Sequence, residues 1–132
     1  PADRVAAFAR QRAAVLDYCA GLSDAEWYTA SAAAGWRAHD VIAHLAAGWG
    51  AVGGVVARTP LRALPTRVGE LGTFPMGVAL PALVFDHHTH LHHDIAPVLG
   101  KPAPATDPAD MAVVVDWMLA VWANQLRAAP PR

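Results

Sequence analysis

Cysteine is almost absent from this chain, and its scarcity limits the kinds of site that the protein can build. The only cysteine among the 132 residues is Cys19. A single thiol can form no internal disulfide, and it cannot supply a zinc cage built from cysteines. Cys19 falls on the apolar face of a predicted helix, so we expect a buried and unreactive thiol. We therefore expect a protein of the reducing cytoplasm.

An excess of charge of one sign is also missing, as are long hydrophobic runs. Charged residues make up 16% of the chain, the formal net charge is −1, and there is no basic run. Proteins that bind nucleic acids or anionic membranes usually carry such a run, so we expect neither partner. No stretch of about 18 apolar residues is free of glycine, proline and charge, which argues against a membrane-spanning helix.

The chain does have the length of one domain and a strongly helical composition. Hydrophobic residues account for 55% of the sequence, and many of them are alanine, the best helix former. There is no alternation typical of strands and no internal repeat. We expect residues 1–132 to form a single all-α domain, an antiparallel four-helix bundle.

The spacing of apolar residues and the cap residues predict where the helices lie. A helix over about 2–20 should end at Gly21, and Ser23 with Glu26 forms a capping box for a short helix. The other predicted helices start near 39–40 and run through "DVIAHLAAGWGAVGGVV", span about 76–99, and cover "DPADMAVVVDWMLAVWANQL". The stretch 59–75 reads as a long connection that borders a pocket. Five tryptophans are expected to pack in the core or at helix junctions: Trp27, Trp36, Trp49, Trp117 and Trp122.

The segment "DHHTHLHHDI", residues 86–95, holds five of the seven histidines. At about 100° per residue, the core-facing stripe of this helix contains Leu80, Val84, Leu91, Ile95 and Val98. His87 and Asp94 fall on or beside that stripe, and His90 sits at its edge. The remaining polar residues are expected to be largely solvated: Asp86, His88, His92 and His93.

Carboxylate and imidazole groups one helical turn apart can hold one divalent ion between neighbouring helices. His44 on the preceding helix can supply a further ligand, and Asp40, one turn earlier, can orient its ring. The predicted metal ligands are therefore His44, His87, His90 and Asp94. Two other interpretations are hydrogen-bonded core histidines and a pH-responsive surface, because exposed histidines would charge together near pH 6.

Two motifs resemble a known family. The segment "LSDAEWYTASAAAGWRAHDVIAHLAAG" is similar to the signature of mycothiol-dependent maleylpyruvate isomerase-like proteins, members of the DinB-like superfamily of metalloenzymes. In that family "GW" precedes "DVxxHL", and a later block ends in "DI" or "DL" followed by "LG". This chain has "GW" at 35–36, "DVIAHL" at 40–45 and "HLHHDIAPVLG" at 90–100. The resemblance covers most of the chain.

The resemblance implies a four-helix bundle that binds one divalent metal, usually zinc. One histidine ligand comes from the second long helix, and a Glu or His plus a His one turn apart come from the third. His44 carries over directly. Counting back from Asp94 puts the other two ligands at His87 and Leu91, and leucine cannot ligate. Ligation by His90 with His87 or Asp94 is favoured by the helical wheel. Pairing of Asp86 with His90, or loss of the metal, are the alternatives.

The resemblance implies a metal-dependent enzyme that acts on a small-molecule substrate, a transferase or isomerase that uses a thiol cofactor such as mycothiol. Zinc is the expected ion, with nickel and iron as alternatives. A competing hypothesis is a non-catalytic bundle, a ligand-binding module or a homodimerisation module whose histidines are remnants. Many relatives continue into a small C-terminal domain, whereas this sequence ends at "RAAPPR".

Overall fold

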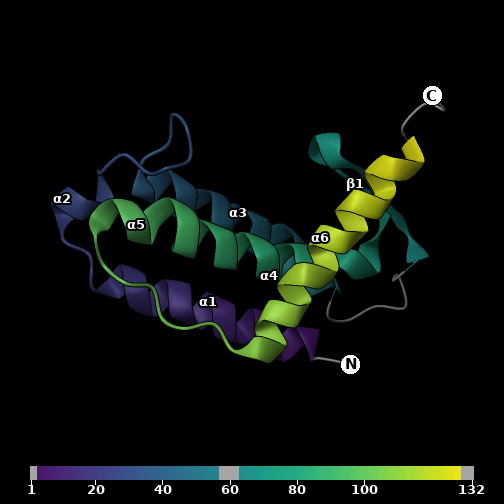
Figure 1. Ribbon diagram of the computed structural model, residues 1–132, viewed down its shortest axis with the longest axis horizontal. Helices are drawn as coiled ribbons and strands as arrows, with labels where there is room; N and C mark the ends of the chain where they lie inside the picture. The colour runs from purple at the N-terminus through teal and green to yellow at the C-terminus, as the bar shows by residue number, and fades with distance from the viewer. Residues whose placement is uncertain (1–2, 57–62, 129–132) are drawn as a thin grey trace.

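The computed structural model describes residues 3–56 and 63–128, with the side chains of 48–56 left out, and over these ranges the protein is mostly helical (Figure 1). Its α-helices are α1 (Arg4–Ala20), α2 (Asp24–Trp27), α3 (Ala38–Val56), α4 (Ala79–Thr89), α5 (Ala96–Leu99) and α6 (Pro108–Ala128). Between α4 and α5 lies the π-helical segment η4 (His90–Ile95), and η2 (Gly69–Leu71) and η3 (Met76–Val78) are short 3₁₀ turns. A helix suited to span a membrane is not found in the described part of the chain.

The helix ends follow the predicted cap residues. Ser23 and Glu26 form the expected capping box at the start of α2: the Ser23 side chain accepts from the Glu26 N–H, and the Glu26 carboxylate accepts from the Ser23 N–H. Gly21 follows α1, and Gly100 ends α5 in the left-handed conformation with φ of 63°. Pro108 opens α6. Because caps depend on adjacent residues, the sequence alone predicts these boundaries well.

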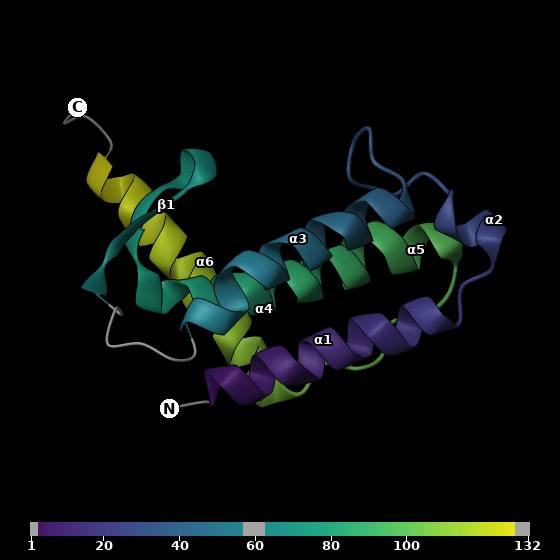
Figure 2. The same ribbon diagram turned by 180° about the vertical axis from the view of Figure 1, so that it is seen from behind.

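Three of the long helical stretches lie side by side, and the fourth crosses them. Figures 1 and 2 show α1 and the α4–α5 stretch running toward the α2 end, with α3 running the opposite way. Helix α4 is central, since it packs against α1, α3 and α6. Helix α6 crosses the others obliquely instead of lying along them. The all-α class holds for the long elements, and the antiparallel four-helix bundle stays a prediction.

The core consists of small apolar clusters strung along these helices. One joins α1, α4 and α6: Ala7, Phe8, Leu80, Leu83, Val84, Val113 and Val114. A second contains Leu91, which is fully buried against Val15, Cys19 and Leu45. Burial raises the pKa of the Cys19 thiol to about 11, so the prediction of a buried cysteine is confirmed. A third cluster joins Ala38, Val41 and Ile95 near the start of α3.

The sequence shows no alternation typical of strands, yet the connection expected over 59–75 contains two short ones. Strands β1 (Pro65–Val68) and β2 (Gly72–Pro75) form an antiparallel hairpin, with Val68 opposite Gly72. Each strand has only four residues, too few to reveal an alternating pattern in the sequence. The hairpin packs on α6 through a Phe74–Trp117 ring contact at 5.0 Å. Gly72 has φ of 106°, a conformation that favours glycine, and a Cβ there would displace the Asn124 side-chain amide, whose Nδ2 would lie 2.7 Å away.

The helical wheel used for residues 76–99 predicts the buried stripe as far as Ile95 but not beyond it. The segment His90–Ile95 is π-helical, with more residues per turn than an α-helix, so a constant 100° step assigns the wrong face to the residues that follow it. Leu91 and Ile95 are buried as expected, but Val98 is 41% exposed, against the prediction that it faces the core. Such wide turns inside α-helices are frequent at functional sites.

Candidate metal centre

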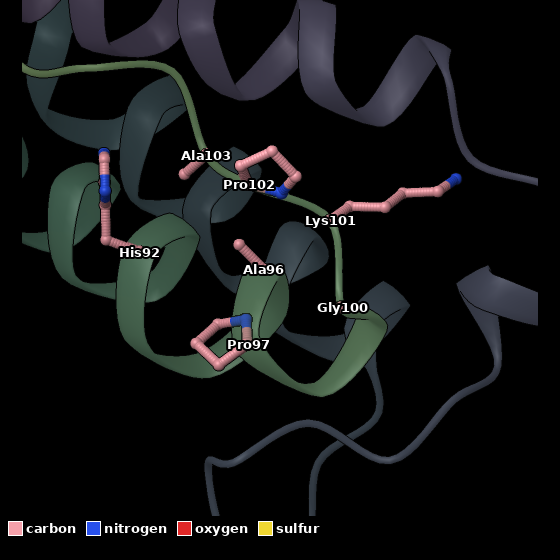
Figure 3. A pocket seen from close by; sticks show the side chains of 7 residues that line it. All are labelled: His92, Ala96, Pro97, Gly100, Lys101, Pro102 and Ala103. Carbon is pink, nitrogen blue, oxygen red and sulfur yellow. The ribbon is translucent and has the colours of Figure 1, made fainter.

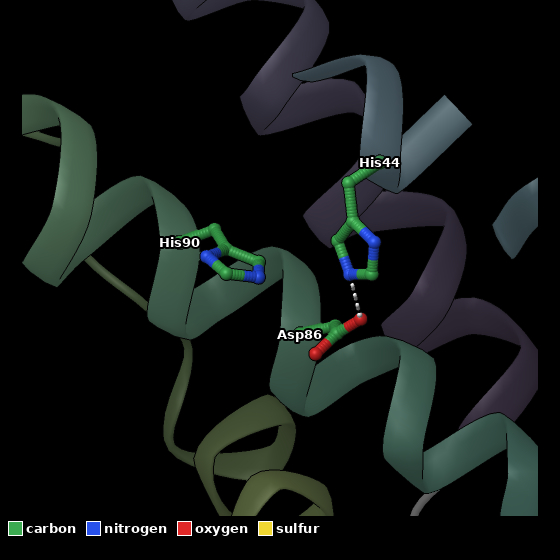
Figure 4. Close-up of side chains that lie close together, drawn as sticks. All are labelled: His44, Asp86 and His90. Carbon is green, nitrogen blue, oxygen red and sulfur yellow. Dashed lines mark hydrogen bonds and ion pairs between the residues drawn. The ribbon is translucent and has the colours of Figure 1, made fainter. Parts of the chain in front are cut away.

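Three side chains from two helical stretches converge at one point. His44 comes from α3, Asp86 from α4, and His90 is the first residue of the π-helical segment (Figure 4). One ligand atom from each lies within 4.8 Å of the other two. His44 Nε2 and Asp86 Oδ2 are 3.2 Å apart, and the His44 and His90 ring centroids are 5.4 Å apart. Asp86 was expected to point away from the interior; its side chain is 38% exposed, but it lies beside His44 at the edge of this group.

Asp94 orients His90 from the opposite side of its ring. The Asp94 carboxylate accepts a hydrogen bond from His90 Nδ1 at 2.6 Å, one helical turn along. Both side chains are about four-fifths buried, at 18% and 19% exposed. Because Nδ1 is engaged in this bond, Nε2 is the nitrogen left for an ion. A carboxylate behind an imidazole is the usual way in which proteins fix the orientation of a metal-binding histidine.

The loop between α2 and α3 places Trp36 against both histidines. The Trp36 ring lies edge-on to His44 at 5.2 Å and stacks over His90 at 6.5 Å. Three backbone bonds secure the loop: the Trp36 carbonyl accepts from Ser31, the Trp36 N–H donates to Ala33, and the Ala32 N–H donates to the Asp94 carbonyl. Trp36 was expected to pack in the core or at a helix junction; it is 38% exposed and packs on the histidines of two helical stretches, where it forms a wall of the site.

His87 lies outside this group. Its ring is 3% exposed, its Nδ1 bonds the Leu83 carbonyl at 2.9 Å, and its edge contacts the Phe8 ring at 5.2 Å. It lines a cavity of about 90 Å³ on the α1 side, together with Leu45 and Arg12. Burial lowers the pKa of His87, so the ring is neutral at pH 7. His87 thus has the environment of a hydrogen-bonded core histidine.

The predicted support of His44 by Asp40 is not seen in the structure. Asp40 Oδ2 accepts the backbone N–H of Arg37 at 2.9 Å, and its other oxygen lies 3.1 Å from His39 Nε2. Asp40 therefore caps the start of α3, and the carboxylate beside His44 is Asp86 instead. Because the Asp40 carboxylate oxygens are used to cap the helix start, they are not available to the His44 ring.

A second group of histidines lies away from the first, beside Thr106. The Thr106 hydroxyl is 3.0 Å from His88 Nδ1 and 3.2 Å from His92 Nε2, and these two rings stack at 4.3 Å. His88 is buried and His92 half-buried, so the prediction that both are largely solvated is wrong; His93 is exposed as expected. His92 also borders a pocket of about 400 Å³ that is lined by residues 96–97 and 100–103 (Figure 3).

The histidines of this helix do not titrate together. Burial, and secondly the charges of His92 and His93, lower the pKa of His88 to about 4. Burial also lowers the pKa values of His87 and His92. A surface on which five histidines gain charge together near pH 6 is therefore not supported, because the linker residue Thr106 and helix α1 cover part of the histidine helix.

The donor set of the first group fits a divalent ion of the zinc type. Two imidazole nitrogens and a carboxylate oxygen are ligands that zinc accepts at ~2.0–2.2 Å, which places neighbouring donors of a tetrahedral site about 3.3 Å apart. His44 Nε2 and Asp86 Oδ2 lie 3.2 Å apart, a hydrogen-bond contact that is also compatible with this spacing, and the His90 donor atom lies within 4.8 Å of both. Three protein ligands leave a fourth position open, as in catalytic zinc sites.

The structure thus brings together two of the four predicted ligands, His44 and His90, and adds Asp86. Asp94 contacts His90 from behind, and His87 faces elsewhere. The resemblance puts the two ligands at positions 87 and 91. Asp86 and His90 each lie one residue earlier, which is the alternative that the sequence left open, and they are likewise one helical turn apart. Leu91, at the position where the resemblance puts a ligand, belongs to the core.

Comparison with known proteins identifies the family of the chain. Neither the curated proteins nor the solved structures include a match to the chain. The family described as the mycothiol maleylpyruvate isomerase N-terminal domain matches residues 8–132, nearly the whole chain. The chain therefore belongs to the mycothiol maleylpyruvate isomerase N-terminal domain family, which is DinB-like.

Proposed function

We propose that this domain binds one divalent metal ion through His44, Asp86 and His90. We further propose that the domain is a thiol-dependent enzyme in which this ion takes part in the reaction. The observation that carries the proposal is the convergence of these three donor atoms within 4.8 Å of one another. Zinc suits the donor set, and nickel and iron are also accepted by imidazole-rich sites. We further propose that the helices form the antiparallel four-helix bundle expected from the sequence, with the ion between neighbouring helices.

The surroundings of the three side chains favour binding of an exchangeable ligand. The side chains of His44 and Asp86 are 43% and 38% exposed, so one side of the group is open to solvent. On the other sides Asp94 holds the His90 ring in place and Trp36 packs against both imidazoles. This combination of fixed ligands and an open face suits a small-molecule substrate that must enter and leave.

The reaction class follows from the family. Its description names mycothiol, a thiol cofactor, and an isomerase. A bound divalent ion keeps a thiol in its thiolate form at neutral pH, and the thiolate is the reactive nucleophile. The domain itself supplies no reactive thiol, since Cys19 is buried and burial raises its pKa to about 11. We therefore propose that the thiol comes from mycothiol and that the domain is a transferase or an isomerase.

The test is metal content followed by thiol binding. Protein purified without added metal should contain about one ion per chain, and His44→Ala should lose it, whereas His93→Ala, an exposed histidine of the same helix, should keep it. Cobalt-substituted protein should then gain a sulfur-to-metal absorption band when a thiol is added. Full metal content in His44→Ala would refute the site, and an unchanged cobalt spectrum would refute the role of the thiol.

A further inference from the structure

Helix α6 carries apolar residues on two opposite faces, and within residues 3–56 and 63–128 only one of these faces is covered. Its buried face holds Val113, Val114 and Trp117, which pack on α1, α4 and the hairpin. The other face is a stripe of six large apolar side chains that are 37–65% exposed: Met111, Val115, Met118, Leu119, Trp122 and Leu126. At ~100° per residue they fall within a sector of about 100°. A helix that is apolar on both sides is normally covered on both.

We propose that this stripe is a dimer interface on which α6 of a second copy of the chain packs antiparallel. The order of the stripe suits a partner identical to itself. With a two-fold axis placed between Met118 and Leu119, these two residues face their counterparts in the other copy. The same axis sets Val115 opposite Trp122 and Met111 opposite Leu126, so every apolar residue meets an apolar residue. An interface of this self-complementary kind closes as a symmetric dimer.

The area of the stripe is enough for such a dimer. A large side chain covers ~150–250 Å², so the exposed fractions leave about 600 Å² of apolar surface per chain. Pairing two copies would bury about 1,200 Å², the lower end of the range for stable, specific interfaces. A groove of about 550 Å³ runs along the stripe between Phe85, Leu71 and Trp122, and it offers room for side chains of the other copy.

Charge favours a protein copy over a membrane surface. The stripe contains no charged residue, so nothing in it repels an identical stripe. Helices that lie on anionic membranes carry several Lys or Arg residues on the polar face. In the described part of α6 the only basic residue is Arg127, and the acidic Asp110 and Asp116 pair with arginines of α1.

The experiment is sedimentation equilibrium of the protein as it stands, with two charge variants. We expect a reversible monomer–dimer equilibrium. Trp122→Glu should weaken dimerisation at least about 10-fold, as loss of a central aromatic residue commonly does. Val5→Glu, which changes an equally exposed apolar residue on α1, should leave the equilibrium unchanged. Circular dichroism checks that each variant is folded.

Cysteine cross-linking tests the position of the proposed two-fold axis without introducing a charged residue into the stripe. Leu119→Cys lies beside the proposed axis, so mild oxidation or a short bismaleimide should link two copies, whereas Val5→Cys should not. The native Cys19 is buried and should stay unmodified. A protein that is monomeric up to several hundred micromolar would overturn the proposal. So would a dimer that Trp122→Glu leaves intact or that Leu119→Cys fails to link.

Discussion

Asp94 gives the sharpest test of how the metal centre is organised. Asp94 contacts His90 and is not one of the three residues proposed to hold the ion: its carboxylate bonds His90 Nδ1 at 2.6 Å, and both side chains are about four-fifths buried. Asp94→Ala should therefore leave the three donor atoms present while the His90 ring loses its orientation. Loss of such a supporting carboxylate typically lowers metal affinity ~10–100-fold, or about 1.4–2.7 kcal/mol of binding free energy.

The assay is competition for zinc between the metal-free protein and a chromogenic chelator. Asp94→Asn should fall between wild type and Asp94→Ala, because an amide oxygen can still accept the bond from Nδ1 but without charge. Asp116→Ala, which removes an exposed carboxylate elsewhere on the surface, is the matched control. Equal affinity in wild type and Asp94→Ala would refute the supporting role. Complete loss of binding, as expected for His44→Ala, would make Asp94 a ligand in its own right.

Three further predictions concern stability and reactivity. The pKa of His88 is about 4 in the folded protein against 6.5 when unfolded, so the unfolded state binds more protons between these pH values. Urea unfolding with chelator present should therefore show the free energy of unfolding falling as the pH drops from 6.5 toward 4. The fall should be less steep in His88→Gln than in the control His93→Gln. Arg10→Ala leaves the Asp110 carboxylate, 1% exposed, without its ion pair, so urea unfolding should show a lower free energy of unfolding than in wild type, and an unchanged value would contradict the reasoning. The Cys19 thiol should react with a thiol reagent at pH 8 only as fast as the protein unfolds, and immediate labelling of the native protein would show that it is accessible.

Much of the fold could be predicted because local chemistry decides it. The Ser23–Glu26 capping box, Gly100 after α5 and Pro108 at the start of α6 are short-range signals, and each lies where the structure has it. The hairpin could not be predicted in the same way. Its strands are four residues long, and their position depends on packing of Phe74 and Gly72 against α6, a contact between distant parts of the chain.

The metal centre was half predictable for a similar reason. His44 stands in a motif of its family, and His90 belongs to a conspicuous histidine cluster. The choice of His87 over Asp86 rested on a helical wheel, and both residues lie in α4 before the π-helical segment. The wheel placed His87 on the buried face correctly, but the ligand atoms converge at a partly exposed edge of the helix, where Asp86 lies. Trp36 gave a signal as part of "GW", but only the fold of its loop shows that it covers both imidazoles.

The zinc K-edge X-ray absorption spectrum of protein loaded with one equivalent of zinc tests the central claim most directly. We expect two imidazole nitrogens and one carboxylate oxygen at ~2.0–2.2 Å from the zinc ion. One imidazole signal should be lost in His44→Ala, and the carboxylate signal should be lost in Asp86→Ala. His87→Phe should leave the spectrum unchanged. A spectrum that changes in His87→Phe but not in Asp86→Ala would contradict the proposed ligand set.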